Sequence, residues 1–60
     1  MTKTQWEDYC IKYIKKNDNM LGVFWSTENQ FRAHALDRLQ DSGKIVITPI
    51  QFPRSKVKIN

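Results

Sequence analysis

The chain has 60 residues, of which 10 are Lys or Arg and 6 are Asp or Glu, and its formal net charge is +4. With 40% hydrophobic and 27% charged residues, its composition is ordinary for one small globular domain. We therefore expect residues 1–60 to form a single domain that buries only about 60% of its unfolded surface and is too short to enclose a substrate between two subdomains.

Several classes of chemistry have no support in the sequence. The single cysteine, Cys10, excludes an internal disulfide, and no Cys/His cluster has the spacing of a zinc site. We find no paired carboxylates and no glycine-rich phosphate loop, so we expect neither an enzyme nor a cofactor nor a small-molecule substrate. The N-terminus lacks an apolar signal core, and no run of about 20 apolar residues occurs, which predicts no membrane contact and a cytoplasmic protein.

The charge is unevenly placed along the chain. Residues 1–43 carry six basic and six acidic side chains and are neutral, whereas residues 44–60 carry no acid. The four cations of this last segment are Lys44, Arg54, Lys56 and Lys58. This asymmetry indicates a polyanionic or acidic partner near that end. The alternative is that these lysines lie on an edge strand, where they block unwanted pairing.

The first predicted helix opens with two capping-box patterns, Thr2 with Gln5 and Thr4 with Glu7. Apolar side chains then recur at steps of three and four, as expected for the buried stripe of an amphipathic helix: Trp6, Tyr9, Cys10, Tyr13 and Ile14. The position of Cys10 on this stripe predicts an inert core thiol. Residues 17–19, Asn-Asp-Asn, end the helix because short polar side chains favour caps and turns.

Residues 20–25, Met-Leu-Gly-Val-Phe-Trp, are apolar on all sides. The β-branched and aromatic residues favour a strand, whereas a short helix capped by Asp18 is the alternative. Periodicity cannot decide a run of six residues, so both assignments stay open, and in either case we expect the run to belong to the core.

The second predicted helix spans residues 27–42. Ser26 and Thr27 are cap residues, and Thr27 with Gln30 fits the capping box. Ser42-Gly43 closes the helix, with glycine at the left-handed C-terminal position. The apolar stripe steps by four, with Leu36 at its edge: Phe31, Ala35 and Leu39.

The last 16 residues predict an antiparallel hairpin. Residues 45–50 are rich in β-branched side chains, and residues 56–59 alternate basic and apolar, so Val57 and Ile59 face the core. Residues 51–55 form the turn, and Pro49, which has no N–H, is expected at an edge. The fold class is therefore α+β: two helices plus a C-terminal hairpin, with a short third strand or helix at 20–25.

A capped helix that ends at Ser42-Gly43 and leads at once into a basic hairpin resembles the C-terminal half of a winged-helix DNA-binding domain. The resemblance covers residues 27–59 and depends on the helix stripe, Leu39, Gly43 and Ile45. It implies that helix 27–42 is the recognition helix and that the hairpin is the wing. The family usually packs a separate helix before the recognition helix, and only residues 18–25 are available for one. A helix there would complete a helix-turn-helix, and a strand would leave it incomplete.

The resemblance predicts which residues would contact duplex DNA. The outward arc of the helix offers polar and small side chains in its first turns, among which amides match the adenine edge in the major groove: Thr27, Asn29, Gln30, Ala33 and His34. Further cations are expected on phosphates: Arg32, Arg38, Lys44, Arg54, Lys56 and Lys58. Asp37 and Asp41 repel phosphates and are compatible with this docking only if the C-terminal end of the helix lies outside the groove.

The competing hypothesis is a protein-interaction or inhibitory module that docks on a larger protein, with a homodimer as its simplest form. Seven aromatic residues are many for a chain this short. Phe52 stands at the predicted hairpin tip, where it is hard to bury, and Trp25 ends the apolar run; both are candidate protein contacts. We expect the core to take the other aromatic residues, and in the simplest packing Trp25 as well: Trp6, Tyr9, Tyr13, Phe24 and Phe31.

Overall fold

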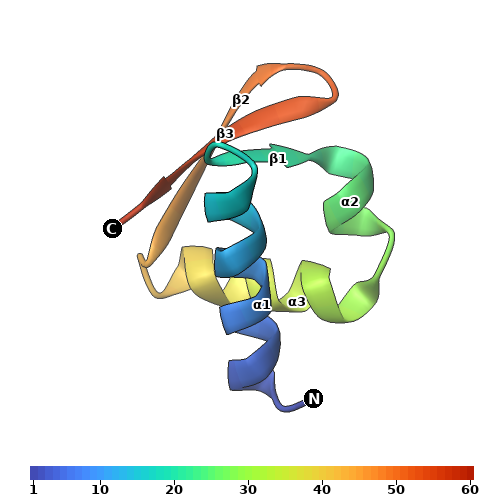
Figure 1. Cartoon of the computed structure of the whole chain (residues 1–60), viewed down its shortest axis with the longest axis vertical. Helices are drawn as coiled ribbons and strands as arrows, with labels where there is room; N and C mark the ends of the chain where they lie inside the picture. Colours follow the sequence, from blue (N-terminus) through green and yellow to red (C-terminus); the bar gives the residue numbers. More distant parts are fainter.

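The computed structural model describes residues 1–60 and confirms an α+β fold with a C-terminal hairpin (Figure 1). The elements follow in the order α1 (Lys3–Lys16), β1 (Met20–Gly22), α2 (Val23–Thr27), α3 (Gln30–Asp41), β2 (Ile45–Gln51) and β3 (Arg54–Ile59). The strands form one antiparallel sheet in the order β1-β3-β2, and the helices gather on one side of it. No helix has the length and apolar character needed to cross a membrane.

Local side-chain chemistry sets both ends of α1. The Thr2 hydroxyl accepts a hydrogen bond from the Gln5 N–H at 3.1 Å, and the Gln5 side chain accepts one from the Thr2 N–H at 2.7 Å. This capping box makes Thr2 the N-cap, so that Thr4 lies inside the helix. After the C-cap Asn17, the chain turns through Asp18 and Asn19 with φ of 57° and 58°, a left-handed conformation that these residue types tolerate.

Residues 20–25 combine the two alternatives that the sequence left open. Met20–Gly22 form β1, which pairs with Lys56, Ser55 and Arg54 of β3, and α2 starts directly after it. Gly22 is both the last residue of the strand and the N-cap of the helix. A helix therefore does precede α3, although it contains only five residues.

The second predicted helix begins three residues later than expected. The Asn29 side chain accepts hydrogen bonds from the N–H groups of Phe31 at 2.8 Å and Arg32 at 3.4 Å, which makes Asn29 the N-cap of α3. The capping box expected between Thr27 and Gln30 is wrong, because the Thr27 hydroxyl donates to the Val23 carbonyl at 2.8 Å and belongs to α2. The helix ends as expected before Gly43, whose φ is 75°.

The core contains eight residues drawn from α1, α3 and all three strands: Cys10, Ile14, Leu21, Ala35, Leu36, Leu39, Ile45 and Val57. Phe31 and Phe24 were expected in it but are 52% and 63% exposed. Tyr9, 43% exposed, also lies outside it. At Phe31 the reason is that Leu36, placed at the edge of the predicted stripe, is buried together with Ala35 and Leu39. The centre of the buried stripe therefore lies further from Phe31 than predicted.

The hairpin is longer and its turn tighter than predicted, since Arg54 and Ser55 already pair with β1 and β2. Val57 is buried and Ile59 half-buried, as the alternation predicted, and Pro49 lies on β2, an edge strand. However, β3 is the central strand of the sheet. Both β1 and β2 pair with it at residues 54–56, whereas Lys58 pairs with β2 alone. Protection of an edge therefore does not explain Lys56, and for that residue the alternative is wrong.

Candidate nucleic-acid interface

Two residues join α2 to α3. Glu28 is the C-cap of α2, where its N–H donates to the Phe24 carbonyl at 2.9 Å, and Asn29 caps α3. The second predicted helix is thus preceded at once by another helix, as the winged-helix resemblance requires, although α2 has only five residues.

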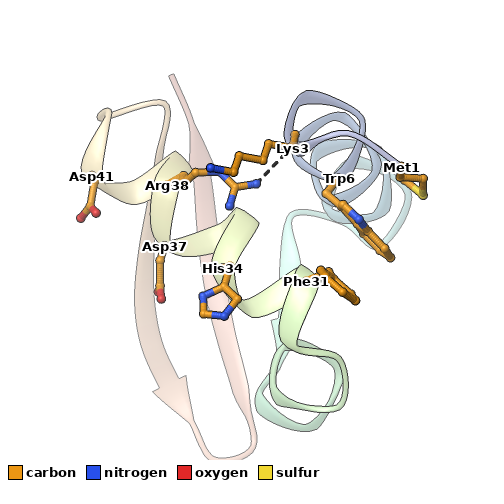
Figure 2. A pocket seen from close by; sticks show the side chains of 8 residues that line it. All are labelled: Met1, Lys3, Trp6, Phe31, His34, Asp37, Arg38 and Asp41. Atoms are coloured by element: carbon orange, nitrogen blue, oxygen red, sulfur yellow. Dashed lines mark hydrogen bonds between the residues drawn. The ribbon is translucent and has the colours of Figure 1, made fainter.

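The outward face of α3 is open to solvent. Two surface hollows border it: one of about 510 Å³ towards the start of α1 (Figure 2) and one of about 170 Å³ towards α2 and β2. Asp37 lines both hollows, which places it at the middle of the outward face. Gln30 and His34 are exposed on the same helix towards its N-terminus. The first half of this face is therefore uncharged, and the second half carries Asp37 and Asp41.

Arg38 does not lie on this outward face. Figure 2 shows its side chain reaching from α3 across to α1, whereas His34 and Asp37 point away from α1. The Arg38 guanidinium donates to the Lys3 carbonyl at 3.3 Å and to the Glu7 carboxylate at 3.5 Å. This side chain thus links the two helices and is not free to hold a phosphate in the way the sequence analysis expected.

Arg32 is likewise used inside the protein. Its guanidinium carbon lies 4.4 Å from the centroid of the Trp25 ring, and one of its nitrogens lies 3.5 Å from the Glu28 carboxylate. The side chain is only 11% exposed, and its Nε is buried without a hydrogen-bond partner. Stacking on an aromatic face is a favourable position for a guanidinium, so Arg32 stabilises the contact of α3 with α2.

The other residues predicted to contact DNA differ in exposure and in whether their side chains already form hydrogen bonds within the protein. Thr27 is exposed, although its hydroxyl is bonded to α2, and the Asn29 side-chain oxygen is occupied by the cap. Ala33 is half-buried and lines the hollow towards α2 and β2. Among the predicted contacts on α3, Gln30 and His34 are the exposed polar side chains without a partner inside the protein.

The cations of β3 lie on the other side of the molecule. Side chains alternate across a strand, and Val57 points into the core beneath the helices, so Lys56 and Lys58 point to the outer face of the sheet. Arg54 has the same parity and pairs with Gly22, the N-cap of α2. Among Arg54, Lys56 and Lys58, only Arg54 therefore lies next to α2. The fourth cation, Lys44, is exposed in the turn after α3.

Two phenylalanines form an exposed pair beside the hairpin tip. Phe52 is 79% and Phe24 63% exposed, and their ring centroids lie 5.9 Å apart at an interplanar angle of 77°. The exposure predicted for Phe52 is confirmed, but Phe24 was missed because nothing in its apolar run marked it as a surface residue. Trp25, the other candidate protein contact, is half-buried and stacks on Tyr13 with centroids 3.9 Å apart.

Groups that could support redox or metal chemistry are few. Cys10 is fully buried, and this burial raises the pKa of its thiol, an effect that the Arg32 and Arg38 guanidinium groups partly offset. The thiol is therefore neutral and shielded. No three His, Cys, Asp or Glu side chains come together where they could hold a metal ion.

The helices and the sheet define this chain as an α+β protein with a C-terminal hairpin, in which a short helix precedes α3. Comparison with family models, with curated proteins and with solved structures gives no match for this chain.

Proposed function

We propose that this protein is a small DNA-binding module of the winged-helix type, in which α3 enters the major groove of duplex DNA and the hairpin tip contacts a flanking phosphate. The observation that carries the proposal is the pair of consecutive helices, α2 and α3, joined by Glu28 and Asn29, with an uncharged, exposed outward face on the first half of α3. We take this pair as a helix-turn-helix in which α3 is the recognition helix. The net charge of +4 supports attraction to a polyanion.

Base contacts would come from the N-terminal half of α3. The amide of Gln30 can donate and accept at once, which suits the N6 and N7 groups of adenine, and His34 lies one turn further along. The exposed N-terminus of α3 also carries a partial positive charge, which favours a phosphate at that end. The carboxylates of Asp37 and Asp41 repel the DNA phosphates, so the C-terminal half of α3 would stay out of the groove.

Phosphate contacts would come from the side chains that the fold leaves unpaired on this side of the molecule. Arg54 lies beside the N-cap of α2, and Lys44 is exposed after the C-terminus of α3. Each phosphate neutralised in duplex DNA adds about 0.9 to the slope of log affinity against log salt. A protein with two such contacts would bind weakly and with a slope of about −2.

The test is fluorescence anisotropy of a labelled duplex of about two helical turns, titrated with protein over a salt series. Arg54→Gln should lower the magnitude of the salt slope by about 0.9, whereas Lys12→Gln, an exposed lysine of α1, should not. Gln30→Ala should reduce the preference among duplex sequences with little effect on the slope. Absence of duplex binding at low salt, where the phosphate contribution is strongest, would refute the proposal.

Docking on a larger protein, or self-association, is the second candidate function, and the exposed Phe24 and Phe52 favour it. Sedimentation equilibrium distinguishes the homodimer: a strict monomer at high concentration removes that version. Duplex binding with sequence preference would instead favour the DNA proposal.

A further inference from the structure

We infer that the outer face of the sheet is a second binding surface, and that it takes a single strand of nucleic acid. On this reading Arg54, Lys56 and Lys58 hold phosphates along β3, and the Phe24–Phe52 pair stacks a base at the end of the row. This surface shares Arg54 with the proposed duplex site, but Lys56 and Lys58 point away from α3, so the inference does not depend on duplex binding.

The first support is the charge of this face. The three strands contain three cations and no acidic residue, and all three cations share one parity on β3. Both ion pairs of the protein involve other cations, Arg32 and Arg38. The row is therefore free to meet negative charge from outside.

The second support is the setting of the row on the central strand. The register places Met20 and Thr48 opposite Lys56 and places Val46, 47% exposed, opposite Lys58. Lys56 thus has uncharged neighbours on both β1 and β2, Lys58 has one on β2 alone, and the helices lie against the other face. Alternate residues of a strand are about 6.8 Å apart, so the row offers charges at regular intervals along a line. A flexible sugar–phosphate backbone can follow such a line.

The third support is the aromatic pair at the Arg54 end. Phe52 follows β2 at the tip, and Phe24 lies in the first turn of α2. Because the two rings meet edge to face at 77°, they do not cover one another by stacking, and both are more than half exposed. The tip is also held in place, since the Val23 N–H donates to the Pro53 carbonyl at 2.8 Å. A fixed, exposed aromatic ring beside cations is the combination that binds single strands, by stacking bases and neutralising phosphates.

The same features argue against a duplex on this face. In a duplex the faces of the bases are already stacked on one another, so a phenylalanine meets only sugar and phosphate. A duplex seated on α3 also cannot reach Lys56 and Lys58, which point away from the helices. An acidic protein segment would use the cations, but it would have no need of a ring that stacks a base.

The experiment measures anisotropy of labelled oligonucleotides of about ten nucleotides, oligo(dT) and oligo(rU) in separate arms, against the full chain. With three phosphate contacts the slope of log affinity against log salt should be about −2, since each contributes about 0.7 in a single strand. Replacing both Lys56 and Lys58 with Gln should reduce the magnitude of the slope to about 0.7. Lys12→Gln is the control and should leave it unchanged.

The aromatic contribution is tested separately. Phe52→Ala should weaken oligonucleotide binding about fivefold or more with an unchanged salt slope, because a stacked base is lost but no charge. The side chain is 79% exposed, so the variant should keep the circular dichroism and unfolding transition of the parent. The two arms identify the source: preference for oligo(dT) indicates DNA, and preference for oligo(rU) indicates RNA.

Three results would overturn the inference. One is no binding of either oligonucleotide at low salt. Another is a slope that the double lysine substitution does not change. The third is that polyglutamate of matched charge displaces the oligonucleotide as well as unlabelled oligonucleotide does, while Phe52→Ala leaves oligonucleotide affinity unchanged. That result would assign the face to an acidic protein. Gln30→Ala is expected to leave single-strand binding unchanged, because Gln30 lies on α3. Loss of duplex binding and loss of single-strand binding can therefore be measured separately, and failure of one proposal does not imply failure of the other.

Discussion

Replacing Asp37 with asparagine removes one negative charge from the middle of the outward face of α3. At about 7 Å in water, a carboxylate and a phosphate repel each other by about 0.6 kcal/mol, and 0.1 M salt reduces this by about half. With the N-terminal half of α3 in a groove, Asp37 lies at the groove edge. For about three phosphates at this distance, Asp37→Asn should strengthen duplex binding by about 1 kcal/mol, or about fivefold. The side chain is exposed, and Asn and Asp have similar helix propensities, so the fold should be unaffected.

The assay is anisotropy of a mixed-sequence duplex at about 0.1 M salt, with Asp8→Asn as the matched control. Asp8 is an exposed residue of α1 that lines neither hollow beside α3, and its substitution changes the net charge by the same amount. We expect the control to change affinity less than about twofold, because its charge is screened over a longer distance. Equal gains from both variants, or no gain from Asp37→Asn, would refute the docking of α3 on DNA.

Three further predictions concern the parts of the fold that position these surfaces. Arg32→Met should lower the free energy of unfolding by about 1 kcal/mol through loss of the contact with Trp25, yet leave duplex affinity within about twofold; a tenfold loss of affinity would show that Arg32 contacts DNA. Gly43→Ala should cost about 1 kcal/mol in urea unfolding, because its φ of 75° disfavours alanine, although no atom lies within 4 Å of an added Cβ; an unchanged midpoint would contradict this. Burial raises the pKa of Cys10 above the ordinary 9.0, so its contribution to the free energy of unfolding is complete below that pH and is lost as pH rises through the raised pKa. In urea unfolding between about pH 8 and about pH 11, the free energy of unfolding of Cys10→Ser should therefore decline less than that of the parent. An identical decline in both proteins would contradict this.

The elements that the sequence predicted well are those fixed by short-range chemistry. The capping box of Thr2 and Gln5, the glycine at the end of α3, and the alternation of Lys56, Val57 and Lys58 each depend on residues close in the chain. The division of residues 20–25 could not be predicted in this way. β1 exists because Met20–Gly22 pair with Arg54, Ser55 and Lys56, far along the chain, and six apolar residues carry no period that reveals it.

The candidate surfaces were predictable as a set of residues but not as an arrangement. Alternation placed Lys56 and Lys58 in solvent, but only the sheet shows that Lys56 lies between two strands and that both lysines point away from α3. The two arginines of α3 were expected on phosphates because their charge is visible in the sequence. Their partners, Trp25 for one and Glu7 for the other, become neighbours only when α2 and α1 pack against α3.

The division of the seven aromatic residues connects the stability of this small domain with its surfaces. Five rings form one continuous series of neighbours across the three helices, with centroid distances of 3.9 to 6.1 Å: Phe31, Trp6, Tyr9, Trp25 and Tyr13. A chain with eight core residues and no disulfide needs such contacts between helices, which explains why partly exposed rings such as Tyr9 and Phe31 are present. Phe24 and Phe52 contact one another but are not part of this series. Since packing of the core does not require them, their exposed position at the Arg54 end of β3 is consistent with the proposed single-strand surface.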